Sequence, residues 1–513
     1  MINFAATLDH HAGIRPEKAA LVWRGGERTY AQLLGRVNAI AAALARGGVG
    51  EGDVVALLMR NRPEFIELVY AVNRLGAAFL PINFRLAPPE WRYIIEHGLA
   101  NAVITEPDFE PVLAPAILDL GIRVQLTVGE PATAAFASYE SFVAPCRGAV
   151  VAPVDVGREA LQRLMYTSGT TAHPKGVCIT HENFCWKNLG LLLEFGWDDS
   201  EVTVVGGPLY HVGALDMGGL TTLHLGGTLV LQPSFDADDL LALIEEHRGT
   251  NCWLAPAMVN ALLQSPGLAT RNLSSLRTIL SGGEKMPESR LRQILDALPN
   301  IWFADAYGLT ETVSSDTFLD RDHMISKIGS VGKPLPHQQV RIVDSEDRPV
   351  AAGTIGEIVL RGPKVFHGYW RDSRATETAI RGGWFHTGDI GRLDADGYLW
   401  VEDRKKDMIV SGGENIASPE VERALFKHPA VLEAAVVARP DERWGEVPYA
   451  FVVLREGYRV TSDELIEFCG QRLAKFKIPR QVEFLGTLPR TPSGKVLKRE
   501  LRGRVASAGD ATS

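Results

Sequence analysis

Residues 166–177 read YTSGTTAHPKGV, and this segment is the starting point for both the fold and the chemistry of the 513-residue chain. Its serine and threonine hydroxyls belong to Thr167, Ser168, Thr170 and Thr171. Gly169 lies among them, and Lys175 follows before an apolar run. Polyphosphates are bound by short hydrogen-bond donors, close backbone approach and a long cation, which this segment supplies. It lacks the Gly-Lys-Ser/Thr sequence of a Walker A loop, so it predicts a phosphate loop of another kind.

Short apolar runs alternate with helical segments on both sides of this loop, which predicts an α/β fold built from parallel βαβ units. Before the loop, strands are expected at 54–59, 77–83 and 101–106, and helices at 29–46 and from Pro63. Residues 107–158 are weakly periodic, and no element is predicted there. After the loop, the expected strands are 161–166, 202–208, 227–233, 250–256, 276–283 and 301–308.

The pattern changes near residue 328 to short strands separated by turns. The Asp396-Gly397 pair between two strand-like runs is typical of a hairpin, and an antiparallel sheet or small β-barrel is expected over about 328–402. Helix and strand patterns start again after EDRKKD (402–407). We therefore predict an N-terminal domain over 1–402 and a smaller α+β domain over 403–513, with a hinge at 404–407.

Composition excludes several classes of protein. The chain has 53 Lys and Arg against 62 Asp and Glu, a net charge of −9, whereas a general nucleic-acid binder is usually basic. Its five cysteines have no zinc-ligand or disulfide-framework spacing. No apolar run approaches the roughly 18 residues of a membrane span, and the first residues do not resemble an export signal. A cytoplasmic protein without a transmembrane segment is expected.

The phosphate loop resembles that of the adenylate-forming (AMP-binding) superfamily of acyl-CoA synthetases, luciferases and adenylation domains. Six further segments resemble motifs of that superfamily, in its order: PLYHVGAL (208–215), SGGEKMP (281–287), DAYGLTE (305–311), GWFHTGD (383–389), EDRKKDMIVSGGENI (402–416) and LPRTPSGKVLKREL (488–501). The chain is identified as a member of this superfamily on these seven motifs. It is most similar by eye to compact bacterial fatty-acyl-CoA synthetases, and nearly as similar to feruloyl- and coumaroyl-CoA ligases.

The resemblance implies site residues. Lys495 resembles the catalytic lysine between the carboxylate and the α-phosphate, Glu311 a Mg²⁺-linked carboxylate, and Thr310 a donor to the phosphate. Asp389 and Arg404 are implied at the ribose. The adenine is implied to stack on Tyr307 beside Gly283, Glu284, Asp305 and Ala306. His211 is implied beside the α-phosphate and the acyl pocket, which the resemblance lines with Val212, Gly213, Gly282 and Thr312.

The implied reaction has two steps: a carboxylate and ATP give an acyl-adenylate and pyrophosphate, and CoA then gives acyl-CoA and AMP. Relatives rotate the C-terminal domain between steps. This implies a pivot at Lys406 and a CoA tunnel at Ser411, Gly412 and Gly413.

The expected partners are therefore a carboxylic acid, ATP, CoA and Mg²⁺, with a homodimer as the alternative to a monomer. Gly213 is expected to leave space for the acyl group, and a medium- or long-chain fatty acid is the favoured substrate.

Alternatives remain at two levels. Within the superfamily, the acid could be aromatic, of the feruloyl or coumaroyl type, or adenylation could be coupled to a carrier protein or an oxidation. A non-catalytic nucleotide-binding protein is the alternative of another class, and the joint presence of Lys175, Glu311 and Lys495 argues against it. The chain also departs from the superfamily pattern at Ala172, where a glycine is usual, and at Ala417-Ser418-Pro419, where Tyr-Pro is usual.

Overall fold

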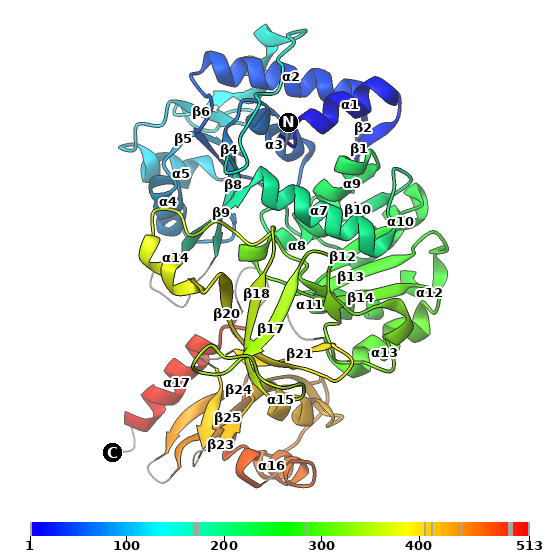
Figure 1. Cartoon of the computed structure of the whole chain (residues 1–513), viewed down its shortest axis with the longest axis vertical. Helices are drawn as coiled ribbons and strands as arrows, with labels where there is room; N and C mark the ends of the chain where they lie inside the picture. The colour runs from blue at the N-terminus through cyan, green and yellow to red at the C-terminus, as the bar shows by residue number, and fades with distance from the viewer. Residues whose placement is uncertain are drawn as a thin grey trace. The chain divides into compact units, whose positions relative to one another are not determined.

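The computed structural model describes residues 3–167, 174–283, 286–404, 407–411, 414–441, 444–473, 475–490 and 496–510. The chain forms two compact units (Figure 1): the first is Met1–Gln339 with Leu360–Phe385, and the second is Val340–Val359 with His386–Ser513. The division predicted at 402/403 lies inside the second unit and stays a prediction.

The first unit contains a seven-stranded sheet in the order β7-β6-β5-β3-β4-β8-β9. Its strands are β3 (Val54–Leu58), β4 (Ala78–Pro81), β5 (Ala100–Thr105), β6 (Val124–Thr127), β7 (Ala137–Ser138), β8 (Leu161–Thr167) and β9 (Lys175–Thr180). All neighbouring pairs are parallel except β8–β9, so the phosphate loop joins an antiparallel pair at one edge. The helices of this part of the chain are α1 (Ala6–Ile14), α2 (Tyr30–Arg46), α3 (Pro63–Arg74), α4 (Pro88–His97), α5 (Glu110–Ile117), α6 (Tyr139–Val143) and η1 (Ala144–Cys146).

A nine-stranded sheet in the order β16-β15-β14-β13-β12-β10-β11-β1-β2 completes the first unit. Its strands are β1 (Ala19–Trp23), β2 (Gly26–Thr29), β10 (Val202–Val205), β11 (Thr228–Leu231), β12 (Asn251–Leu254), β13 (Thr278–Gly282), β14 (Trp302–Tyr307), β15 (Thr317–Phe318) and β16 (Lys333–Pro334). The helices are α7 (His181–Phe195), α8 (Val212–Ala214), the π-helical turn η2 (Leu215–Gly219), α9 (Leu220–Leu225), α10 (Ala237–His247), α11 (Pro256–Gln264), α12 (Gly267–Thr270), α13 (Glu288–Ala297), η3 (Thr310–Thr312), η4 (Arg321–His323) and α14 (Ser373–Ala379). Five consecutive strands of this sheet are parallel neighbours, as the alternating sequence predicts: β14, β13, β12, β10 and β11.

Local sequence explains many of these boundaries. Thr29 caps α2: its side chain accepts a hydrogen bond from the Gln32 backbone N–H, and its own backbone N–H donates to Gln32 Oε1. Pro63 begins α3, where its missing N–H and fixed φ cost nothing. Every residue of β3 is buried, as expected for a strand covered on both faces.

Between 107 and 158, where the sequence predicted no element, the structure has α5, β6, β7, α6 and η1. These elements are short, and α5 contains an internal proline, Pro115, so their periodicity is too weak to read.

The second unit contains most of a five-stranded sheet, ordered β17-β18-β20-β19 with β21 paired to β20. Its strands are β17 (Gln339–Val343), β18 (Gly356–Arg361), β19 (Ile380–Arg381), β20 (Trp384–Leu393) and β21 (Leu399–Arg404). The antiparallel pair β20–β21 confirms the hairpin predicted at Asp396-Gly397, and Gly397 takes the positive φ of 84° that the turn requires.

A second sheet of this unit, ordered β23-β22-β25-β24 with β26 beside β25, has helices on both faces. Its elements are β22 (Ile409–Ser411), β23 (Glu414–Ile416), α15 (Ser418–Phe426), β24 (Val431–Asp441), β25 (Gly445–Leu454), α16 (Ser462–Gly470), η5 (Lys475–Lys477), β26 (Gln481–Phe484) and α17 (Lys498–Asp510). Alternate residues of β24 enter different cores: Val436 packs with α15 and α16, and Val437 packs with α17.

Candidate active site

The phosphate loop is anchored at both ends by the β8–β9 ladder. Thr167 and Lys175, which flank the loop, are directly paired at the last register position of these antiparallel strands. The predicted phosphate-binding residues Ser168, Gly169, Thr170 and Thr171, and the departure at Ala172, lie outside the described residues.

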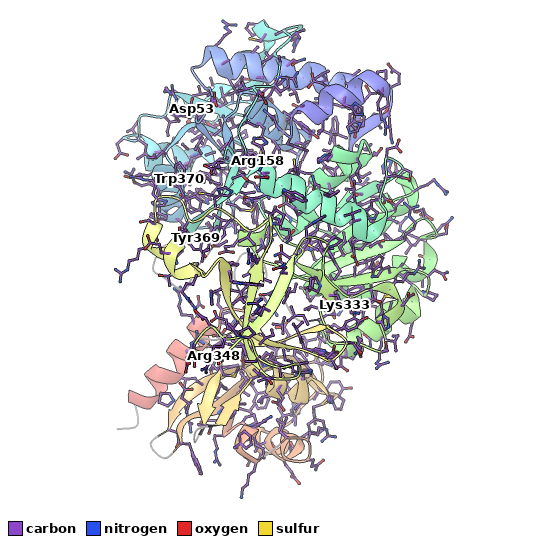
Figure 2. The ribbon with its side chains drawn as sticks, viewed as in Figure 1. Asp53, Arg158, Lys333, Arg348, Tyr369 and Trp370 are labelled. Atoms are coloured by element: carbon purple, nitrogen blue, oxygen red, sulfur yellow. The ribbon has the colours of Figure 1, made fainter. Side chains whose placement is uncertain are left out.

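Tyr369 connects Lys175 to Glu311, although no motif in the sequence marks this residue. Its segment, labelled at Tyr369 and Trp370 in Figure 2, runs along β9. The Trp370 N–H donates to the Gly176 carbonyl at 2.7 Å, and Val177 and Tyr369 form an antiparallel bridge. This places the Tyr369 ring 4.8 Å from the Lys175 ammonium, a cation–π distance. The Tyr369 hydroxyl donates to Glu311 Oε1 at 2.9 Å. Two residues predicted at the phosphates from distant motifs are therefore brought together by a third.

The carboxyl ends of β13 and β14 bring together the residues predicted near the adenine. Gly282 is paired with Ala306 across these parallel strands, and Tyr307 follows at the end of β14 with 8% of its surface exposed. A Cβ on Gly282 would lie 2.8 Å from the Ala306 carbonyl oxygen, so only glycine permits this approach. Gly283 continues with a φ of 90°. Its neighbour Glu284 lies outside the described residues.

Trp253, on β12, fills the space beside two predicted acyl-site residues. A Cβ on Gly213 would lie 2.4 Å from Trp253 Cζ2 and 2.5 Å from its Cε2. The His211 ring stacks near the indole, with ring centroids 6.4 Å apart and planes at 24°. The sequence predicted open space for the acyl group at Gly213, but in the structure the Trp253 indole packs against this glycine. Val212 is buried at the start of α8.

A buried charged cluster ties the strand before the phosphate loop to the turn after His211. Arg163 on β8, Lys187 on α7 and Asp216 in η2 are fully buried. Arg163 Nη2 lies 2.5 Å from Asp216 Oδ2, and Lys187 Nζ donates to the Asp216 carbonyl at 2.8 Å. Burial lowers the pKa of Lys187 to about 7. Because buried charges need such partners, the cluster fixes β8 and η2 relative to each other.

Thr310, Glu311 and Thr312 form the single turn η3 that follows β14. The Phe366 N–H donates to the Glu311 carbonyl at 2.8 Å. Thr312 is fully buried, and its hydroxyl donates to the carboxylate of Asp316. Thr312, predicted in the acyl pocket, therefore also holds its own turn together.

In the second unit, the two residues predicted at the ribose are direct neighbours. Asp389 on β20 is paired with Arg404 on β21, and the Asp389 N–H donates to Thr387 Oγ1 at 3.0 Å. Ser411, predicted in the CoA tunnel, ends β22. The remaining predicted residues of this unit, Lys406, Gly412, Gly413 and Lys495, lie outside the described residues.

The departure at Ala417-Ser418-Pro419 forms the start of α15. Ser418 is fully buried, and its N–H and hydroxyl both donate to Asp403 Oδ2, at 2.8 and 2.9 Å. Lys498 Nζ also bonds to the Ser418 hydroxyl. The serine is thus a hydrogen-bonded structural residue of this unit.

A magnesium ion is compatible with the residues present. Among the described residues, no group of three or more His, Cys, Asp or Glu side chains is placed to hold a metal ion. The lone Glu311 carboxylate fits the usual mode of Mg²⁺, which takes one or two carboxylates and completes its shell with waters and substrate phosphates.

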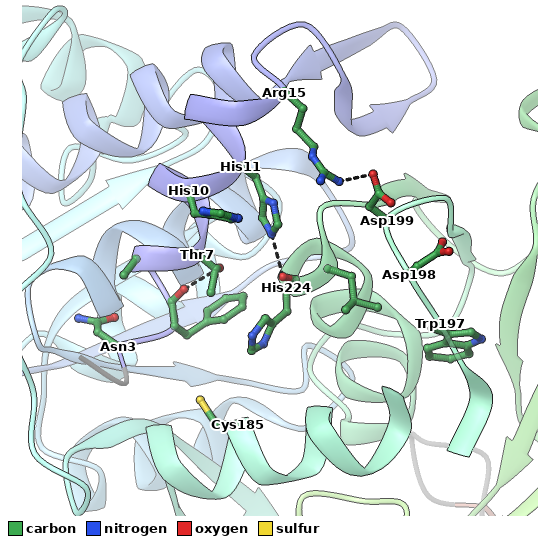
Figure 3. Close-up of a pocket in the computed structure, with 13 residues that line it drawn as sticks. Asn3, Thr7, His10, His11, Arg15, Cys185, Trp197, Asp198, Asp199 and His224 are labelled. Atoms are coloured by element: carbon green, nitrogen blue, oxygen red, sulfur yellow. Dashed lines mark hydrogen bonds and ion pairs between the residues drawn. The ribbon is translucent and has the colours of Figure 1, made fainter. Parts of the chain in front are cut away.

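A cavity of about 720 Å³ lies elsewhere in the first unit, between α1, α7 and α9 (Figure 3). The imidazole of His11 is hydrogen-bonded at 2.8 Å to the carbonyl of His224, and Arg15 pairs with Asp199. None of the described residues predicted from the motifs lines it. It is therefore distinct from the candidate active site.

No helix in the described part of the chain is long and apolar enough to cross a bilayer.

Comparison with known proteins gives a consistent result. Residues 8–370 match the AMP-binding enzyme family, and residues 420–495 match the AMP-binding enzyme C-terminal domain. The chain is 40% identical over 495 residues to a feruloyl-CoA synthase of Amycolatopsis sp, covering 96% of this chain and 97% of the relative. It is 38% identical to an indoleacetate–CoA ligase of Aromatoleum aromaticum, covering 97% of each.

Among solved structures, an o-succinylbenzoate-CoA synthetase from Bacillus subtilis in complex with its acyl-adenylate intermediate superimposes with a TM-score of 0.86. That structure is 32% identical and covers 97% of each chain. The seven motifs, the two-unit α/β fold and these relatives agree: the chain belongs to the AMP-binding enzyme family and is an ATP-dependent, AMP-forming acid–thiol ligase that works through an acyl-adenylate.

Proposed function

We propose that this ligase activates an aromatic monocarboxylic acid. The observation that carries the proposal is the position of Trp253, whose indole packs on Gly213 and stacks near His211. An indole in this place shortens the space for an alkyl tail and offers a flat face to a planar ring, a contact worth about 0.5–1.5 kcal/mol beyond area burial.

Two further observations support an aromatic acid. The Trp253 Nε1–H has no hydrogen-bond partner in the described part of the chain and can donate to a polar ring substituent. The relatives named above act, by their names, on feruloyl, indoleacetate and o-succinylbenzoate groups. The expectation of a medium- or long-chain fatty acid stays a prediction, and the same experiment tests it.

The proposed first step is attack of a carboxylate oxygen on the α-phosphorus of ATP, with pyrophosphate as the leaving group. Lys175 and the phosphate loop bind the phosphates, Thr310 donates to them, and Lys495 neutralises charge at the α-phosphate. These groups act by positioning and charge stabilisation, because both reactants are anionic. When bound, Mg²⁺ would be held through Glu311 and would neutralise phosphate charge.

The proposed second step is attack of the CoA thiolate on the acyl carbon, with AMP as the leaving group. Asp389 and Arg404 hold the ribose in both steps, and Tyr307 stacks on the adenine. The C-terminal domain pivots at Lys406, so that the segment with Ser411, Gly412 and Gly413 replaces Lys495 at the site.

An acid panel tests the proposal. AMP release would be measured with CoA and ferulate, indoleacetate, benzoate, octanoate or palmitate as the acid. We expect kcat/KM for at least one aromatic acid to exceed that for both fatty acids by about tenfold or more. The fit of a substrate to an apolar pocket changes the free energy of transition-state binding by roughly 1–3 kcal/mol. Faster turnover of octanoate or palmitate would contradict the aromatic assignment and support the fatty-acid expectation.

A second measurement tests the lysine. Lys495→Ala should abolish adenylation and leave thioester formation from supplied acyl-adenylate largely intact, because the lysine is needed only where charge builds at the phosphate. The matched control is Arg499→Ala, which removes an exposed cation of the same motif and should leave both half-reactions unchanged. Equal loss of both half-reactions in Lys495→Ala would remove the assignment.

A further inference from the structure

The turn that carries Glu311 has an unfavourable backbone. Three consecutive residues after η3, none of them glycine, take left-handed conformations: Val313, Ser314 and Ser315, with φ of 54°, 62° and 59°. Residues other than glycine visit this region rarely and singly, and a β-branched valine is least suited to it. The surrounding structure must therefore hold the turn in place.

Lys364 holds this turn through all three of its donors. It comes from the segment after β18 and is buried, with 4% of its surface exposed. Its Nζ donates to the Thr312 carbonyl at 2.9 Å, to the Ser314 carbonyl at 2.6 Å and to Asp316 Oδ1 at 2.6 Å. An ammonium group has only three N–H donors, so every one is used on residues 312–316.

Asp316 completes the arrangement from inside the turn. It is fully buried, and besides Lys364 its carboxylate accepts from Gln338 Nε2 at 2.9 Å and from the Thr312 hydroxyl. Its backbone N–H donates to the Tyr307 carbonyl at 2.7 Å, which joins the end of the turn to the end of β14. The ion pair thus ties the turn at 313–315 to the end of β14, next to two predicted nucleotide contacts, Tyr307 and Glu311.

The segment that supplies Lys364 also contacts Glu311 directly. Two residues beyond Lys364, the Phe366 N–H donates to the Glu311 carbonyl, and Tyr369 donates to its carboxylate. Movement of Lys364 away from the turn would therefore displace both hydrogen bonds to Glu311.

We propose that Lys364 and Asp316 are positioning residues for Mg·ATP: their buried ion pair holds residues 313–315 left-handed and so presents Thr310 and Glu311 to the nucleotide. The proposal rests on the roles given above to Thr310 and Glu311. Neither member of the pair needs to touch the substrate.

The test uses two variants. Lys364→Met removes the ammonium group, and Asp316→Asn is a milder change that keeps the shape of the aspartate side chain. The matched control is Arg74→Met. Arg74 is equally buried and paired with Asp9 at 2.7 Å, but it lies on α3 and contacts none of the predicted site residues. Pyrophosphate exchange would be measured in the full-length protein at varied Mg·ATP and varied acid, with the melting temperature alongside. The acid is any one that the wild-type chain activates.

We expect both site variants to raise KM for Mg·ATP about tenfold or more, from the loss of hydrogen bonds to a charged group, with a much smaller change in KM for the acid. Thioester formation from supplied acyl-adenylate should be unchanged. Arg74→Met should lower the melting temperature without changing either KM. An unchanged KM for Mg·ATP, or an equal change in Arg74→Met, would overturn the proposal.

Rescue by glycine gives a second readout, and the Asp316→Asn background provides it even where Lys364→Met does not fold. Ser314→Gly and Ser315→Gly, added to Lys364→Met or to Asp316→Asn, should recover about threefold or more of the KM change, since glycine takes a positive φ freely. No recovery would show that the left-handed turn is not what the ion pair maintains. Failure of the wild-type chain to activate an aromatic acid would instead count against the proposed function alone.

Discussion

Substitution of Gly213 by alanine should be harmful for a reason that only the packing shows. The glycine lies in α8 and has no positive φ, so the backbone accepts alanine, and helix propensity alone would favour it by about 1 kcal/mol. The added Cβ would lie 2.4 Å from an indole carbon of Trp253, whereas carbon atoms normally approach to about 3.5–4.0 Å. The indole must therefore move by about 1 Å.

Overpacking of this kind costs about 1–3 kcal/mol, which corresponds to roughly a 5- to 150-fold loss of kcat/KM if the displaced indole enters the acyl site. Pyrophosphate exchange with an aromatic acid and with acetate measures it, and we expect the aromatic acid to lose more. Gly35→Ala is the matched control. Gly35 lies in α2 with no atom within 4 Å of its added Cβ, so it should gain up to about 1 kcal/mol in stability with unchanged activity.

A double-mutant cycle decides whether Trp253 is the cause. In a Trp253→Leu background the indole is gone, so the added methyl of Gly213→Ala should cost little, and the coupling energy should be about 1 kcal/mol or more. A penalty that persists unchanged in that background would refute the reasoning, as would wild-type kinetics in Gly213→Ala.

Two other predictions rest on named contacts, and a third on the pivot that the family resemblance implies. Tyr369→Phe removes the hydrogen bond from the hydroxyl to Glu311 but keeps the ring. We expect KM for Mg·ATP in pyrophosphate exchange to rise about tenfold, because hydrogen bonds to charged groups are worth about 1.5–3 kcal/mol. An unchanged KM would mean that the bond has no role in nucleotide binding. Burial lowers the pKa of His181 from 6.5 to about 4, and its Nδ1 accepts from the Phe4 N–H. Its folded pKa lies below its unfolded one, so its contribution is complete above pH 6.5 and is lost as pH falls toward 4. Unfolding at pH 5 should cost about 2 kcal/mol less than at pH 7.5 from this group, and His181→Gln should flatten the decline; an equally steep decline in that variant would contradict this. Lys406→Pro, which fixes φ at the predicted pivot, should spare pyrophosphate exchange and lower CoA-dependent turnover, and unchanged overall turnover would place the pivot elsewhere.

Much of the fold could be predicted because its signals are local. The runs at 54–59 and 301–308 are strands because they are apolar and short, and α2 begins at the residue after Thr29 because that side chain caps it. The elements between 107 and 158 could not be predicted, because β7 has two residues and α5 carries an internal proline.

The residues of the candidate site likewise fall into those with a local sequence signal and those without one. Lys175, Glu311 and Asp389 stand in recognisable motifs, whose resemblance to those of the family predicts contacts with phosphate, metal and ribose. Tyr369 and Trp253 carry no such signal: a tyrosine after glycine and a tryptophan in an apolar strand are ordinary in sequence. Their roles come from the bridge to β9 and from the packing on α8.

The sequence by itself therefore determined the α/β class, the family and the motif from which a phosphate loop is predicted, since each depends on residues that are neighbours in the chain. The tertiary structure alone decided that Lys364 and Asp316, 48 residues apart, form a buried ion pair around a left-handed turn. It also decided that an indole occupies the space beside Gly213. The physical reason is that a charge or a ring acquires its meaning from what surrounds it after folding, and those surroundings come from segments far apart in sequence.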